Sequence, residues 1–268
     1  MKAYERVVTQ PGLSSIPPPG KQSDITKSEP VSTHCAVLDG SVLRALADVA
    51  IELRGPLSVI LGHAENVLQT VDDDDILRSV TAIERSGKRI DRIASDVLTL
   101  GALEHEIAQR TAATAAQSFQ LKECINDVLD RLAPLIRDRR PALSIQLPAD
   151  GCRVPGDYYF WFLAFQHLLE NSLGDNPRRM EIAINAERTN GTVLIEFTDK
   201  GVGIPPNDLP NIFTPFYRVQ RAGNHSHRGV GLGLYFVRRV VTCFGGTITV
   251  SSIPSVRTAF TITFNTPD

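Results

Sequence analysis

The chain has 268 residues, of which 42% are hydrophobic and 22% are charged, and its net charge is -2. This balance is typical of soluble globular proteins, and the length suggests about two domains. Because nucleic acid and anionic membranes bind clustered basic charge, neither is an expected partner.

Signals for membrane insertion, export and metal binding are weak. The longest apolar stretch, residues 158–165, is far shorter than the roughly 20 residues of a membrane span, and no apolar signal core follows the N-terminus. The four cysteines are widely spaced without a CxxC pair, which favours reduced thiols over disulfides or zinc. His225 and His227 lie in a polar segment with no third ligand nearby, so we interpret them as loop residues. We expect a cytoplasmic protein without direct membrane insertion.

Residues 1–36 are rich in Pro, Ser, Thr and Lys and have almost no periodic apolar positions. This composition predicts a disordered tether.

Residues 37–106 contain two long amphipathic segments. In the first, apolar residues recur every seven positions in two interleaved series: Leu43, Ala50, Leu57, Ala64 and Leu46, Leu53, Ile60, Val67. The second repeats the pattern at Ile76, Ile83, Ile90 and Val97, with Ile93 and Leu100 between them. The acidic run 72–75 predicts an N-cap for the second helix, and residues 103–106 predict its frayed end. Such a hairpin cannot bury its stripe alone, so we expect pairing with a second copy in a four-helix bundle.

A linker at 107–116 precedes a predicted mixed α/β domain at 117–268. Strands are expected at about 117–120, 142–147, 180–187, 192–198, 247–251 and 259–264, and helices at about 121–139, 157–173 and 230–243. The fold class is therefore α+β: a long helical hairpin followed by an α/β sandwich, with a pocket between helix and sheet.

Two glycine loops frame the candidate site. The first, residues 199–204 (DKGVGI), follows a strand and brings the Asp199 carboxylate into a turn, where Gly201 and Gly203 allow close backbone approach. The second, residues 229–234 (GVGLGL), opens a helix whose free amides suit phosphate. Its glycines are Gly229, Gly231 and Gly233.

With residues 167–171 (HLLEN) upstream and 212–218 (IFTPFYR) between the loops, this order resembles the histidine protein kinases of two-component signalling. The resemblance extends to the ATP-binding fold of gyrase-type ATPases and covers about residues 37–268. It implies ATP and Mg²⁺ as cofactors: Asp199 would accept a hydrogen bond from the adenine amino group, Asn171 would hold Mg²⁺, and the Gly229 amides would cap the phosphates. The nucleotide-binding residues implied are His167, Glu170, Asn171, Asp199, Gly201, Gly203, Phe213, Phe216, Arg218, Gly229, Gly231 and Gly233.

The first helix departs from the family pattern twice. Residues 51–57 (IELRGPL) are similar to the phosphoacceptor motif His-Glu-Leu-Arg-Thr-Pro-Leu, but Ile51 stands in place of the histidine. At about 100° per residue, Ile51 is expected on the exposed face, and isoleucine has no lone pair to attack a γ-phosphate. Gly55 replaces the residue that orients water for phosphatase activity. We therefore expect no autophosphorylation at this position, although Glu52 remains as a candidate base.

A third departure is Gly174, where the family often has a basic residue for the phosphates. The candidate substitutes are Arg178, Arg179, Lys200 and Arg228.

The leading hypothesis is a dimeric histidine-kinase-like signalling protein that binds ATP and regulates a response regulator or an intact kinase, as a homodimer or as a heterodimer with a related kinase. The enzyme alternative is a working kinase with another acceptor, in itself, in a heterodimer partner or in a separate phosphotransfer protein. Within the chain, His63 is interpreted as a packing residue near the bundle seam, and His105 as a residue at the frayed helix end. An ATP-hydrolysing clamp of the gyrase type is disfavoured by the long hairpin.

Overall fold

The computed structural model describes residues 40–109, 117–148, 152–174, 180–189, 191–219 and 231–265. The predicted tether and most of the predicted linker lie outside these ranges. So do the following residues considered above: Arg178, Arg179, His225, His227, Arg228 and Gly229.

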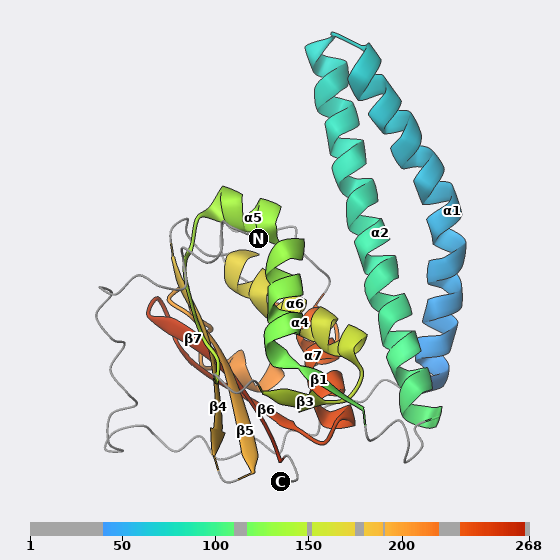
Figure 1. Ribbon diagram of the computed structural model, residues 1–268. Helices are drawn as coiled ribbons and strands as arrows, with labels where there is room; N and C mark the ends of the chain where they lie inside the picture. Colours follow the sequence, from blue (N-terminus) through green and yellow to red (C-terminus); the bar gives the residue numbers. More distant parts are fainter. Residues whose placement is uncertain are drawn as a thin grey trace.

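Two long antiparallel helices, α1 (Gly40–Thr70) and α2 (Asp74–Gln109), form the predicted hairpin (Figure 1). They approach closely at two glycines of α2. A Cβ on Gly87 would lie 2.7 Å from a side-chain carbon of Leu61, and one on Gly101 would lie 3.2 Å from the Cβ of Ala47. Because α2 continues to Gln109, the fraying expected from residue 103 is wrong, and His105 lies inside the helix.

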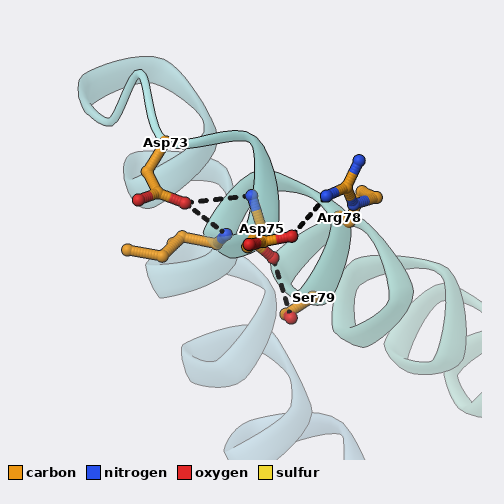
Figure 2. Close-up of polar contacts among 5 residues, drawn as sticks. Asp73, Asp75, Arg78 and Ser79 are labelled. Carbon is orange, nitrogen blue, oxygen red and sulfur yellow. Dashed lines mark hydrogen bonds and ion pairs between the residues drawn. The ribbon is translucent and has the colours of Figure 1, made fainter.

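The acidic run between the helices caps α2, as the sequence predicts. One carboxylate oxygen of Asp73 accepts hydrogen bonds from the backbone N–H groups of Asp75, at 2.9 Å, and Ile76, at 3.0 Å. Figure 2 shows Asp73 beside Asp75 at the start of α2. Asp75 also forms an ion pair with Arg78. The Asp73 carboxylate satisfies two of the first amides of α2, and both carboxylates place negative charge at its positive end.

The two heptad series of α1 differ in burial. Where their side chains are described, residues of the first series are buried between the helices: Ala50, Leu57 and Ala64. Leu53 and Ile60 of the second series stay exposed, and so do Ile76, Ile83 and Ile90 of α2. We name these five exposed residues the apolar stripe. The hairpin thus buries only part of its heptad pattern within one chain.

The second part of the chain is a mixed five-stranded sheet in the order β2-β4-β5-β7-β6, with helices α4, α6 and α7 on one face (Figure 1). The strands are β2 (Ala142–Gln146), β4 (Glu181–Thr189), β5 (Thr192–Asp199), β6 (Thr247–Ile253) and β7 (Arg257–Asn265). β2 and β4 are parallel, and the other neighbours are antiparallel. A separate two-stranded ribbon joins β1 (Ser118–Gln120), the strand expected at about 117–120, to β3 (Arg153–Pro155), which the sequence pattern did not predict.

The helix expected at 121–139 is divided. Leu132 separates α4 (Leu121–Arg131) from α5 (Ala133–Arg139), which has Pro134 in its first turn. Proline fits the first turn of a helix but not its interior, because it lacks an N–H and its ring clashes with the carbonyl four residues earlier. The other helices are α6 (Tyr158–Gly174), α7 (Gly233–Cys243) and the short 3₁₀ helix η1 (Leu209–Asn211).

Trp161 anchors the core between α6 and the sheet. It is fully buried, its indole N–H donates to the Pro155 carbonyl at 2.8 Å, and its ring contacts those of Phe165 and Phe244. Trp161 is therefore a core residue.

The C-terminal half of α2 packs on the second part of the chain and lies between it and α1 (Figure 1). Arg239 of α7 binds one carboxylate oxygen of Glu104 through Nε, at 2.7 Å, and Nη2, at 2.5 Å. Both side chains are mostly buried, and Leu100 and Leu103 beside them are also buried. A charge-assisted pair of this kind fixes orientation as well as proximity.

Within the described ranges, no helix is long and apolar enough to cross a membrane.

Candidate functional site

A cavity of about 1160 Å³ lies between α6, the glycine loops and α2. It brings together eight of the residues predicted for nucleotide binding: His167, Glu170, Asn171, Asp199, Gly203, Arg218, Gly231 and Gly233. Gly201, Phe213 and Phe216 do not line it.

Asp199 marks the buried end of the cavity. It ends β5 and is 5% exposed, and the Ser172 hydroxyl donates to its Oδ2 at 3.3 Å. Thr258 is paired with Asp199 across the β5–β7 ladder and lines the same end. A buried carboxylate that faces a cavity can accept a hydrogen bond from a flat amino-bearing base.

The first glycine loop needs glycine at one position for two reasons. Gly203 has a φ of +69°, and a Cβ there would lie 2.6 Å from the backbone oxygen of Ile253. The next amide, that of Ile204, donates to the Ser252 hydroxyl at 2.8 Å. The β6–β7 turn therefore holds this loop against the cavity.

The second loop has the same requirement. Gly231 has a φ of +82°, and a Cβ there would lie 2.5 Å from the backbone oxygen of Tyr217. The amide of Phe216 donates to the Gly231 carbonyl at 3.0 Å. Gly233 then begins α7, whose first amides have no partner within the helix.

α6 carries the polar wall of the cavity. His167 and Asn171 are one turn apart, and the His167 ring lies so close to Gly233 that a Cβ there would be 3.1 Å from its Nδ1. Burial lowers the pKa of His167, Glu170 opposes this effect, and Arg92 adds to it. The imidazole is therefore neutral at pH 7. Gln166 donates to Glu170 at 2.9 Å, which orients that carboxylate.

Two phenylalanines of segment 212–218 lie outside the cavity. Phe213 is buried against the Phe260 ring, with the Arg238 guanidinium 5.8 Å from the Phe213 ring centre. Phe216 is half exposed and has a φ of 65°, which is unusual for a residue with a side chain. Neither residue lines the cavity, and Phe216 lies beside the second glycine loop.

Sequence reasoning missed the wall that α2 contributes. The residues of α2 that line the cavity are Lys88, Asp91, Arg92, Ser95, Asp96 and Thr99. The spacing of residues 88, 92, 95 and 99 places them on one helical face, and this polar face was the available signal. Lys200 is not part of the site, because it pairs with Glu181 at 2.6 Å and does not line the cavity. It therefore does not substitute for the basic residue that the family often has at the position of Gly174.

Ile51 stands on α1 with 60% of its surface exposed, as the helical geometry predicts. Arg54, one turn further on, donates to Ser95 at 3.2 Å and lies 3.6 Å from a carboxylate oxygen of Asp91. Since Ser95 and Asp91 line the cavity, this part of α1 lies level with it. A Cβ on Gly55 would meet no atom within 4 Å, so nothing in the packing demands glycine there.

The site fits a nucleotide with one divalent cation. Gly203 and Gly231 leave space that a side chain would fill. The buried carboxylate of Asp199 can accept a hydrogen bond from a nucleobase, and the amide oxygen of Asn171 is a ligand type that Mg²⁺ accepts. Among the described residues, no group of three or more His, Cys, Asp or Glu side chains could hold a metal by itself. A cation here would therefore depend on oxygens of the phosphates.

Comparison with protein families gives two matches. Residues 41–106 match the His Kinase A (phospho-acceptor) domain, and residues 156–268 match the histidine kinase-, DNA gyrase B-, and HSP90-like ATPase family. The chain therefore belongs to the two-component sensor histidine kinase family.

Curated relatives include the sensor histidine kinase RppB of Synechocystis, 29% identical over 81% of this chain and 47% of the relative. The sensor protein IrlS of Burkholderia pseudomallei is 31% identical over 81% of this chain and 46% of its own length. The sensor-like histidine kinase SenX3 of Mycolicibacterium smegmatis is 25% identical over 95% and 67%. The chain thus spans about half the length of RppB and IrlS.

Solved structures confirm the fold. The histidine kinase AdeS of Acinetobacter baumannii has a TM-score of 0.56 at 20% identity, covering 81% of this chain and 98% of that chain. Full-length ShkA in complex with AMPPNP has a TM-score of 0.63 at 21% identity, covering 84% and 46%. Histidine kinase ThkA in complex with the response regulator TrrA has a TM-score of 0.56 at 21% identity, covering 85% and 63%.

Proposed function

We propose that this chain binds Mg-ATP and controls a partner response regulator or kinase, without phosphorylating itself at the usual position of α1. Membership of the two-component family supports a signalling role. The observation that carries the proposal is the exposed Ile51 on α1, level with a cavity that keeps Asn171, Asp199 and both glycine cradles.

In this proposal Asp199 binds the adenine edge, and Asn171 holds Mg²⁺ against the phosphates. The amides at the start of α7 bind the phosphate tail, because they lie at the positive end of the helix. When bound, ATP supplies a phosphoryl group for transfer. Ile51 offers no nucleophile to receive it, so nucleotide binding acts through the arrangement of α2 against the ATP-binding domain.

We further propose that the apolar stripe pairs with a second hairpin. Its five residues are each 43 to 49% exposed in the single chain and recur at heptad spacing along both helices. A long apolar seam of this kind is stable in water when a second hairpin covers it. The second hairpin belongs either to another copy of this chain or to a related kinase.

The proposed downstream partner is a response regulator, as in the solved complex of ThkA with TrrA. Gly55 lacks the side chain with which the family orients water, so we expect binding of the regulator without removal of its phosphate. The cytoplasmic location expected from the sequence stays a prediction.

A second candidate function is a working kinase with another acceptor. His63 and His105 are both exposed in the single chain, so each is accessible to a phosphoryl donor. The packing role predicted for His63 would therefore require a second chain.

Incubation with ATP labelled at the γ-phosphate separates the two candidates. The proposal expects Mg-ATP binding by calorimetry and no acid-labile label on the chain. Acid-labile label that is lost in His63→Ala or His105→Ala would overturn the proposal and establish the second candidate. Absence of binding at millimolar Mg-ATP would reject both.

A further inference from the structure

One wall of the cavity belongs to the hairpin rather than to the ATP-binding domain. Lys88, Arg92, Ser95 and Thr99 follow one face of α2 and line the cavity together with residues of α6. The pair between Glu104 and Arg239 holds α2 in this place. The hairpin therefore contributes side chains to the space that a nucleotide would occupy.

The two ends of the cavity differ in chemistry. Asp199 lies at the buried end, where its carboxylate can accept a hydrogen bond from a nucleobase. At the other end the His167 ring lies against Gly233, at the start of α7. The positive end of a helix attracts anions. The phosphates of a bound nucleotide therefore belong at the end marked by His167.

α6 contributes no positively charged side chain to this end of the cavity, which we call the phosphate end. The cavity-lining side chains of α6 here are Gln166, the neutral His167, Glu170 and Asn171. Asp96 adds a second carboxylate from α2. Unless a cation lies among them, these acids repel a polyanionic ligand.

Arg92 is placed to supply that charge. It is exposed, lines the cavity, and makes no hydrogen bond or ion pair with any other described residue. Its charge nevertheless acts on both neighbours of the phosphate end. Burial raises the pKa of Asp96, and the charge of Arg92 opposes that rise. Burial lowers the pKa of His167, Glu170 opposes that decrease, and Arg92 lowers the pKa further.

The other cations of the α2 and α4 walls are less suited. Lys88 is engaged by Glu84 on its own helix. Arg131 lines the cavity beside Leu132 and Pro134, and its charge is not among the causes that shift the pKa of His167.

We propose that Arg92 of α2 binds the phosphate groups of the nucleotide, so that the hairpin completes the ATP site of its own chain. This inference rests on the proposed ATP binding. A guanidinium donates paired N–H groups that match phosphate oxygens. Since adenosine lacks phosphates, Arg92 contributes to the affinity for ATP and not to that for adenosine. Phosphorylated nucleotides therefore favour the packing of α2 on the ATP-binding domain.

The test titrates Mg-ATP and adenosine into the full chain by calorimetry, for wild type, Arg92→Gln, Arg92→Lys and Arg85→Gln. Arg85 lies seven positions earlier on the same helix, is exposed and does not line the cavity, so it is a matched control for lost charge. Arg92→Gln should weaken Mg-ATP binding about tenfold to a hundredfold, as for a lost hydrogen bond to a charged group, and leave adenosine unchanged. Arg92→Lys should retain part of the affinity, and Arg85→Gln should change neither.

An indirect role is separated by the double variant Arg92→Gln with Asp96→Asn. If Arg92 merely neutralises Asp96, removing both charges restores Mg-ATP affinity, and the proposal is overturned. If Arg92 contacts phosphate, the double variant stays weak. Unchanged ATP affinity in Arg92→Gln, or equal losses of affinity for ATP and adenosine, also overturns the proposal for Arg92. In either case, binding of Mg-ATP by the wild type upholds the proposed function. A wild type that binds no nucleotide rejects both.

Discussion

Asp96 should make the protein less stable as the pH rises from about 4 to about 6. Burial raises the pKa of Asp96 from 3.8 to about 6, the charge of Arg92 opposes the rise, and Glu170 adds to it. In the unfolded chain the pKa returns to its ordinary value, so the native state binds this proton more tightly. A carboxyl group with a raised native pKa contributes stability below its unfolded pKa, and that contribution is lost as the pH rises through the native pKa.

The size of the effect follows from the difference in pKa. A difference of about two corresponds to about 3 kcal/mol. Since Asp96 is partly exposed, solvent screening reduces this to about 1 to 3 kcal/mol. Asp96→Asn keeps the shape and removes the charge. It should therefore be about 1 to 3 kcal/mol more stable than wild type at pH 8 and nearly equal to it at pH 4.

Urea unfolding of both proteins from pH 4 to pH 8 measures this difference. The protein concentration must be constant, because association changes apparent stability. A variant that is less stable than wild type at pH 8, or a difference that does not change with pH, would refute the reasoning. The first result would mean that the Asp96 carboxylate gains more from Arg92 than it loses by leaving water, and the second that the native pKa of Asp96 does not differ from its unfolded value.

Three further predictions concern the proposed function. Asp199→Asn or Asn171→Ala should weaken Mg-ATP binding by about 1.5 to 3 kcal/mol, measured by calorimetry, because each removes a polar contact to the nucleotide or its cation; unchanged affinity would remove these residues from the site. Leu53→Asp combined with Ile90→Asp should give monomers in sedimentation at tens of micromolar. Ile51→Asp should remain a dimer, because Ile51 is also exposed but lies outside the apolar stripe. A monomeric wild type would contradict the bundle. Ile51→His should gain acid-labile autophosphorylation that wild type lacks, and an unlabelled variant that still binds Mg-ATP would place the defect elsewhere in the site.

The local features were readable from the sequence because each has a cause within a few residues. Heptad spacing predicts long helices, and an acidic run before an apolar segment predicts the Asp73 cap. Glycine where φ is positive is required by the backbone itself, which is why the loops at Gly203 and Gly231 stood out. The exposure of Ile51 follows from the 3.6-residue turn alone.

Tertiary structure decided which surfaces meet. The heptad pattern marks positions to be buried, but it does not say which partner buries them, so the division between the hairpin's own seam and the exposed apolar stripe needed the packed structure. The pairing of Thr258 with Asp199 depends on strand register, which residues distant in the chain set together. The position of Arg92 at the cavity depends on contacts such as that between Glu104 and Arg239, 135 residues apart, which no local pattern encodes.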